Sequence, residues 1–300
     1  MKIAIASGKG GTGKTTVATN LARVASEKGQ SVAYLDCDVE EPNGHIFLKP
    51  EIEKEQSVIS LIPEVDEGKC IHCGKCGEFC RYSAIVCIRE KVLVYPELCH
   101  SCGGCALVCP TGAITEKQRQ TGVVQIGKSD SIDFVHGISD LGVAVTPPLV
   151  RAVKKSAPSA DMIIIDAPPG TSCPVIESVR DVDYVVLVAE PTPFGLNDLK
   201  LAVEMCRTLG LRFAVVVNRV GIGDDRVHRY CKDEGIEILQ EIPDDRKIAQ
   251  AYSRGMLACE VSQDYRKLFE QLLDRINNNM LGLCGKSTSN LVEEDSDASV

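Results

Sequence analysis

The sequence predicts an α/β protein with a mostly parallel, doubly wound sheet, into which a small α+β domain is inserted. Two observations predict the main fold. A glycine-rich loop joins the first apolar strand to a helical segment, and short apolar strands then alternate with helical segments along the chain. A third observation predicts the insert, because eight cysteines gather in two similar runs between residues 70 and 109.

The strands of the main domain are short apolar runs, at residues 2–6, 31–36, 161–166, 184–189, 213–218 and 236–241. Helical patterns lie between or beside them, at residues 17–28, 196–209, 225–234, 245–254 and 264–280. Strands that alternate with helices form a parallel sheet covered on both faces, and a ligand then binds at the carboxyl ends of the strands. We expect the last helix to pack on the core, because it carries acidic residues and is followed by an acidic tail, residues 285–300, expected to be disordered.

The glycine-rich loop has the spacing of a P-loop between a strand and a helix. Glycines let backbone amides turn onto phosphate oxygens, and the following helix adds its positive end. Lys14 is expected to bridge the outer phosphates and Thr15 to bind magnesium. The sequence therefore predicts an ATP site formed by the loop residues Gly8, Lys9, Gly10, Gly11, Thr12, Gly13, Lys14, Thr15 and Thr16.

The two cysteine runs share the pattern C-x2-C-x2-C-x3-C and are offset by 29 residues. The likeness extends to Ala84-Ile85 and Ala113-Ile114, which indicates an internal duplication. Three thiols within seven residues suit one corner of a metal–sulfide cube. Disulfides and zinc sites are the alternatives, but zinc takes four ligands, usually from well-separated C-x2-C pairs.

This segment resembles a bacterial two-cluster ferredoxin, in which the fourth cysteine of each run reaches the other cluster. The resemblance implies two [4Fe-4S] clusters. One would be held by Cys70, Cys73, Cys76 and Cys109, and the other by Cys99, Cys102, Cys105 and Cys80. Arg81 departs from the family, which usually has at this position the proline that Pro110 supplies in the second run.

The main domain resembles the MinD/ParA/Mrp superfamily of ATPases, because Lys9 stands where that family has a second lysine. There this lysine reaches the nucleotide of the opposite subunit, which implies dimerisation on ATP; a solvated loop lysine is the alternative. Asp38 matches the acid that positions the attacking water, and Asp166 the acid that holds magnesium with Thr15 and Asp38. Buried strands also end in aspartate simply to cap the next helix.

Four further residues match family positions around the nucleotide. Gly170 would offer its amide to the γ-phosphate, Asn218 would bind adenine, and Pro243 and Asp244 would flank it. The resemblance places the ATPase domain at residues 1–61 and 119–284, with the ferredoxin domain at 62–118 between them.

Seven cysteines lie outside the two runs, and we expect most to be small buried residues. Cys173 follows the loop after Asp166, where a redox role competes with packing, and Cys284 has no second cysteine beside it.

Together these features predict a nucleotide-gated dimer that couples ATP to electron transfer toward a redox or metallocofactor-assembly partner. The dimer is a homodimer or a heterodimer with a similar ATPase. A cluster carrier of the Mrp type and a positioning ATPase of the MinD/ParA type are the alternatives. The net charge of −9 disfavours nucleic acid, and no long apolar run predicts membrane insertion. The absence of a leader pattern and the thiol content favour the cytoplasm.

Overall fold

A nine-stranded sheet forms the centre of the computed structural model, which describes residues 1–284. The strand order is β11-β10-β9-β1-β8-β2-β7-β6-β3, and every neighbouring pair from β11 to β7 is parallel. The parallel strands are β1 (Lys2–Ala6), β2 (Val32–Asp36), β7 (Ile132–Ser139), β8 (Met162–Asp166), β9 (Tyr184–Ala189), β10 (Phe213–Val220) and β11 (Ile238–Pro243).

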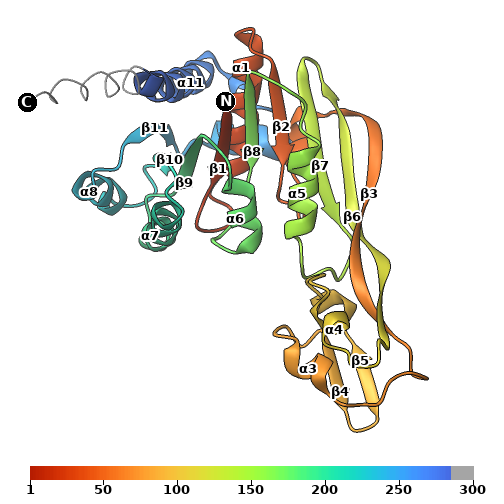
Figure 1. Ribbon diagram of the computed structural model, residues 1–300. Helices are drawn as coiled ribbons and strands as arrows, with labels where there is room; N and C mark the ends of the chain where they lie inside the picture. The colour runs from red at the N-terminus through yellow and green to blue at the C-terminus, as the bar shows by residue number, and fades with distance from the viewer. Residues whose placement is uncertain (285–300) are drawn as a thin grey trace, which may run out of the picture.

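Helices cover both faces of the sheet, as the alternation of strands and helices predicts (Figure 1). Ile3 and Ile5 of β1 face one apolar core, while Ala4 and Ala6 face the other, because successive strand residues point to opposite sides. The first core packs against α1 (Lys14–Glu27), α2 (Gly44–Leu48), α10 (Ala258–Val261) and α11 (Gln263–Cys284). The second packs against α5 (Pro147–Lys155), α6 (Cys173–Val179), α7 (Pro193–Thr208) and α8 (Arg226–Asp233).

All six predicted strands are present, but the last begins two residues later than expected, at Ile238. Gly235 closes α8 in a left-handed conformation, with φ of 64°. The amide of Ile236 then donates to the carbonyl of Cys231 at 2.7 Å, so this residue belongs to the turn. The short helix α9 (Arg246–Ser253) follows β11 as predicted.

Two long antiparallel strands, β3 (Glu51–Val65) and β6 (Ile114–Ser129), extend the sheet beyond β7. β6 pairs with β7 only from Gly122 onward; from there to Ile114, β3 and β6 continue as a two-stranded arm. Neither strand was predicted. The expected limits of the insert, at 62 and 118, fall within these strands.

The arm carries the cysteine-rich lobe, residues 66–113, at its far end (Figure 1). The lobe contains α3 (Lys75–Phe79), β4 (Ile85–Ile88), β5 (Lys91–Val94), a 3-10 turn (Pro96–Leu98) and α4 (Gly104–Leu107). Its own small core includes Cys76, Ile85 and Ile114. Figure 1 shows the lobe separated from the helices that flank the sheet.

Within residues 1–284, no helix combines the length and apolar character needed to cross a bilayer. The acidic tail expected at 285–300 lies outside the described residues.

Candidate functional site

The glycine-rich loop connects the end of β1 to the start of α1, as its spacing predicts. Gly11 and Gly13 have φ of 78° and 94°, which side chains with a Cβ rarely adopt. A Cβ on Gly13 would also collide with the amide nitrogen of Asn218. These two glycines therefore allow the loop to turn and to pack closely against β10.

A cavity of about 440 Å³ lies against this loop at the carboxyl edge of the sheet. Lys14, whose side chain is buried, lines the cavity from the start of α1, and Asp38 lines it from the loop after β2. Further along, the cavity is bounded by residues expected around adenine, namely Asn218, Pro243 and Asp244. The structure thus brings together residues that are more than 200 positions apart in the chain.

Asp166 has the surroundings that a magnesium–nucleotide site requires. It is buried at the end of β8, and its Oδ2 accepts a hydrogen bond from the hydroxyl of Tyr34 at 3.0 Å. Its other oxygen has no partner among the described residues, although it is equally buried. Burial raises the pKa of this carboxyl, while the Thr15 hydroxyl and the Lys14 ammonium lower it. Because Mg²⁺ prefers carboxylates and retained water, these residues fit the ion.

Asp38 lines the same cavity as Lys14. Burial and the nearby Asp166 raise its pKa to about 6, and Lys14 opposes that shift. A cation bound nearby would therefore favour the ionised carboxylate.

Asp36 has a role that the sequence analysis did not foresee. Its carboxylate accepts hydrogen bonds from the backbone amides of Asp38 (3.1 Å), Asn43 (3.1 Å) and Gly44 (2.8 Å). It therefore holds the start and the end of the loop that carries Asp38. A signal was present in the sequence, because Asp36 ends an apolar strand and an aspartate there can accept from backbone amides of the loop that follows.

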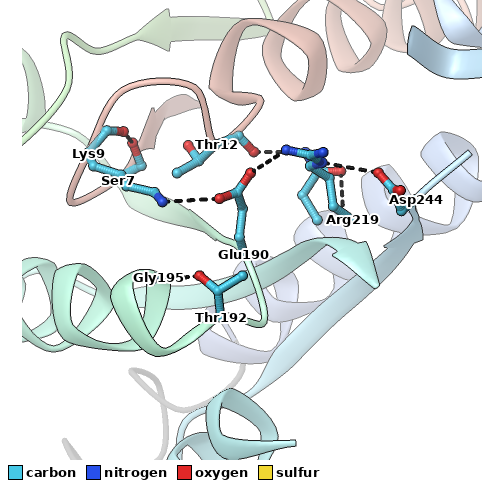
Figure 2. A network of polar contacts seen from close by, with 9 residues as sticks. Ser7, Lys9, Thr12, Glu190, Thr192, Gly195, Arg219 and Asp244 are labelled. Carbon is cyan, nitrogen blue, oxygen red and sulfur yellow. Dashed lines mark hydrogen bonds and ion pairs between the residues drawn. The ribbon is translucent and has the colours of Figure 1, made fainter. Parts of the chain in front are cut away.

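Lys9 lies within a network of ions shown in Figure 2. Its Nζ is 3.1 Å from Oε2 of Glu190, and Oε1 of Glu190 is 3.1 Å from Nη1 of Arg219. Arg219 in turn contacts Asp244, with 3.0 Å between Nε and Oδ1. Glu190 and Arg219 were both missed by the sequence analysis, because nothing near them in sequence marks them as neighbours of the P-loop.

Asn218 contacts the P-loop in this structure. Its Nδ2 donates to the carbonyl of Thr12 at 2.7 Å, and its Oδ1 accepts from the amide of Arg219 at 3.0 Å. The expected contact with adenine stays a prediction.

The eight cysteines of the two runs border two separate cavities. One, of about 300 Å³, is lined by Cys80, Cys99, Cys102 and Cys105. The other, of about 20 Å³, is lined by Cys70, Cys73, Cys76 and Cys109. Each set combines three cysteines of one run with the fourth of the other. The smaller cavity has room for about one water molecule, so a larger group there requires its side chains to turn outward.

The duplication is visible in the backbone as well as in the sequence. Left-handed residues recur 29 positions apart, with φ of 54° at His72 and 53° at Ser101, and 78° at Gly74 and 68° at Gly103. The two halves therefore hold their cysteines on loops of the same shape.

The fourth cysteine of each run receives backbone hydrogen-bond donors. Burial disfavours the thiolate of Cys80, but amides of the following residues lower its pKa overall. Cys109 behaves alike: burial disfavours its thiolate, but Thr111 and nearby amides together lower its pKa, and the amide of Ala113 lies 3.3 Å from its sulfur. Donors aimed at sulfur stabilise thiolate ligands. Among the described residues, no three His, Cys, Asp or Glu side chains are grouped as for a single metal ion.

Four of the remaining cysteines are buried, as predicted: Cys37, Cys206, Cys231 and Cys259. Burial raises the pKa of Cys231 to about 11 and those of Cys206 and Cys259 to about 12, so these thiols stay protonated. Cys173 is exposed at the start of α6. The side chain of Cys284 lies outside the described part of the chain.

Comparisons with known proteins agree with this architecture. The family model described as CobQ/CobB/MinD/ParA nucleotide binding domain matches residues 3–258. An uncharacterised protein of Methanocaldococcus jannaschii is 30% identical over 279 residues, which cover 92% of this chain and 97% of that protein. An iron-sulfur cluster carrier protein of the same organism is 23% identical, covering 92% and 84%. The septum site-determining protein MinD of Pyrococcus horikoshii, solved with Mg-ADP, superposes with a TM-score of 0.60 at 19% identity, covering 95% and 99%.

Proposed function

Because the chain belongs to the CobQ/CobB/MinD/ParA nucleotide-binding family, we propose that it is a nucleotide-gated dimer that couples ATP hydrolysis to electron transfer through two [4Fe-4S] clusters. The family makes it a MinD/ParA-like P-loop ATPase. The coupling, the clusters and a redox or metallocofactor-assembly partner are the proposal.

The nucleotide half rests on the residues gathered around the 440 Å³ cavity. Lys14 and the loop amides would bind the β- and γ-phosphates, and Thr15, Asp38 and Asp166 would hold the magnesium ion, directly or through water. Asp38 orients a water for attack on the γ-phosphorus. The bond to the β-phosphate oxygen breaks, leaving ADP and inorganic phosphate.

The electron-transfer half rests on one observation: the eight cysteines divide between two cavities in the crossed sets that two cubane clusters need. Bound there, the clusters would supply one-electron transfer. The cysteine thiolates would hold them, and the amide donors at Cys80 and Cys109 would favour the thiolate form.

A chain of backbone contacts supports coupling between the halves. Next to Asp38, the carbonyl of Val39 accepts from the amide of Ser139, the last residue of β7, at 2.8 Å. The following amide, of Asp140, donates to Thr121 at 3.0 Å. Thr121 is the extra residue of a bulge in β6, and its hydroxyl donates to Val58 of β3 at 3.2 Å. The arm therefore leaves the sheet at a point that is hydrogen-bonded, through Asp140 and Ser139, to the loop that carries Asp38.

Anaerobic analysis tests the cluster half. Purified protein is expected to hold about eight iron and eight sulfide per chain, as two cubane clusters require. Cys102→Ser and Cys73→Ser should each remove one cluster, whereas Cys206→Ser, at a buried cysteine of α7, should remove none. Zinc as the main metal, or equal iron content in all variants, would contradict the proposal.

Redox titration tests the coupling. The midpoint potential of at least one cluster is expected to shift on addition of Mg-ATP to the wild type, and not in Lys14→Ala. A coupling of about 1–3 kcal/mol corresponds to about 40–130 mV for a one-electron centre. Potentials that are equal with and without ATP would make the lobe independent of the nucleotide.

The second candidate is a cluster carrier, which the 23% identical carrier protein of M. jannaschii favours. The exposure of Cys73 and Cys102 is compatible with handing a cluster to another protein. Incubation with an apo-ferredoxin separates the two functions. A carrier loses iron and sulfide to the acceptor on ATP turnover, whereas an electron-transfer protein keeps both.

A further inference from the structure

Glu190 is a nearly buried carboxylate held between two cations. Its side chain is 9% exposed, while those of Lys9 and Arg219 are 33% and 48% exposed. It directly follows β9, which pairs with β1, and this pairing places it beside the first turn of the P-loop. Figure 2 shows its two oxygens pointing in different directions, one toward Lys9 and one toward Arg219.

The two cations differ in how firmly they are held. Arg219 has a left-handed backbone, with φ of 59°, and its amide donates to the side chain of Asn218 at 3.0 Å. Its guanidinium contacts both Glu190 and Asp244, so with the backbone amide Arg219 is held by three polar contacts. Lys9 contacts Glu190 through a single flexible side chain, and its ammonium is a point charge that can exchange partners.

This difference between the two cations determines what happens to Glu190 when Lys9 moves away from it. A buried carboxylate that loses its only counter-ion is strongly destabilised. Glu190 keeps Arg219 after Lys9 moves away, so the release leaves no bare buried charge. Lys9 is thus held by a contact that can be broken at low cost.

We propose that Glu190 is a positioning residue that holds Lys9 in its own subunit until the phosphates of a nucleotide bound to a second copy of this chain compete for it. The inference rests on the proposed role of Lys9 across the dimer. Arg219 determines how strongly Glu190 attracts Lys9, because both cations pair with the same carboxylate. Its contact with Asp244 places this control beside the base-binding end of the cavity. No covalent bond changes in this step.

Dimerisation in the presence of Mg-ATP, measured by sedimentation, tests the proposal with changes of opposite sign. Glu190→Gln frees Lys9 and should tighten the dimer by about three- to tenfold, the range of one partly buried ion pair. Arg219→Met leaves Lys9 as the main counter-ion and should weaken the dimer by a similar factor. Because Arg219 lines the nucleotide cavity, ATP affinity is measured separately for each variant, with a fluorescent analogue at concentrations where the protein is monomeric.

Two further variants complete the design. The double variant Glu190→Gln/Arg219→Met should dimerise at least as tightly as the wild type, since Lys9 then has no ion pair to break before it reaches the second subunit. Arg229→Met is the matched control, because it removes an exposed pair with Asp225 elsewhere on the surface and should have no effect.

A second measurement does not depend on dimer formation. In the nucleotide-free monomer, limiting acylation followed by mass spectrometry reports how accessible the amine of Lys9 is. Glu190→Gln should raise the labelling rate of Lys9 by about threefold or more relative to Lys28, whose pair with Asp274 is unchanged. This readout remains informative if Arg219→Met does not fold.

The outcomes separate this inference from the proposed function. If Lys9→Ala dimerises like the wild type, the role of Lys9 across the dimer is wrong, and the inference falls with it. If Lys9→Ala fails to dimerise while Glu190→Gln matches the wild type in both dimerisation and Lys9 labelling, the hold by Glu190 is overturned and the proposed function stands.

Discussion

The hydrogen bond between Tyr34 and Asp166 offers a direct test of how the magnesium carboxylate is prepared. Both residues are fully buried, and the Tyr34 hydroxyl donates to Oδ2 at 3.0 Å. Tyr34→Phe removes this donor and little else, because the ring keeps its stacking on Phe134, with centroids 5.6 Å apart.

The magnitude follows from the kind of partner. A hydrogen bond to a charged group contributes about 1.5–3 kcal/mol, against about 0.5–1.5 kcal/mol for a neutral one. Oδ1 of Asp166 already has no partner in the described residues, so the variant leaves the carboxylate without its tyrosine donor as well. We expect a loss of about 2 kcal/mol in the free energy of unfolding, or a thermal midpoint lower by about 4–8 °C.

Urea unfolding and nucleotide titration measure the two consequences. Loss of the donor raises the pKa of Asp166 beyond the value that burial already sets, so affinity for Mg-ADP should fall by about tenfold. Affinity for ADP with excess chelator should not change. Tyr184→Phe is the matched control, because this largely buried hydroxyl accepts from the neutral amide of Asn279 at 3.2 Å. We expect it to lose about 1 kcal/mol and no magnesium dependence.

Equal destabilisation by Tyr34→Phe and Tyr184→Phe would refute the reasoning, since it would mean that Asp166 carries no charge for the hydroxyl to stabilise. A drop in ADP affinity that is the same with and without magnesium would refute the assignment of Asp166 to the ion.

Three other predictions concern the nucleotide site and its surroundings. Lys14→Ala should abolish tight ATP binding in a fluorescence titration, whereas Asp38→Ala should bind ATP yet release almost no phosphate; normal turnover would remove Asp38 from the reaction. Asn218→Ala loses its bond to Thr12 and should reduce the preference for ATP over GTP, with equal discrimination arguing against a contact with the base. Burial and nearby His45 lower the pKa of His136 from 6.5 to about 4. As the pH falls, the unfolded chain therefore binds this proton first, and up to about 3 kcal/mol of the free energy of unfolding is lost between pH 6.5 and 4. His136→Leu should flatten this part of the profile of stability against pH.

The strands that carry the nucleotide site could be predicted because they are buried on both faces. Residues 2–6 and 162–166 are almost continuously apolar, which is typical of a central parallel strand. The loop between the first strand and its helix has the spacing of a P-loop, in the strand-to-helix context that a P-loop requires. Local pattern was therefore sufficient for this edge of the sheet.

β3 and β6 could not be predicted in the same way. β3 is an edge strand with one side open to solvent, and its first half reads EIEKEQ, without an apolar face. β6 begins with ITEKQRQ, which lies in the arm, and of these residues only Ile114 reaches a core. Their pairing depends on register and on the lobe they carry, and neither leaves a pattern in a short window of sequence.

Glu190 shows a different limit of sequence analysis. Its position, directly after an apolar strand, looks like that of many surface carboxylates. Only the pairing of β9 with β1 brings it to Lys9, 181 positions earlier in the chain. A motif identified the lysine, but its partner is set by tertiary structure.

The loop that carries Asp38 is hydrogen-bonded to the base of the arm, which is the connection that the proposed coupling requires. Asp36 binds the amides of Asp38, Asn43 and Gly44, so one buried carboxylate closes residues 36–44 into a ring. A closed ring has few dihedral angles free to absorb a displacement of Asp38 locally. One of its outward contacts is the bond from Ser139 to Val39, which leads to the end of β7 and the bulge at Thr121. A bulge is the weakest point of a paired strand, and this one lies where the arm leaves the sheet. Under the proposed coupling, a shift that the γ-phosphate imposes on the ring would act at the base of the arm, and the length of the arm would increase the resulting displacement of the cysteine-rich lobe.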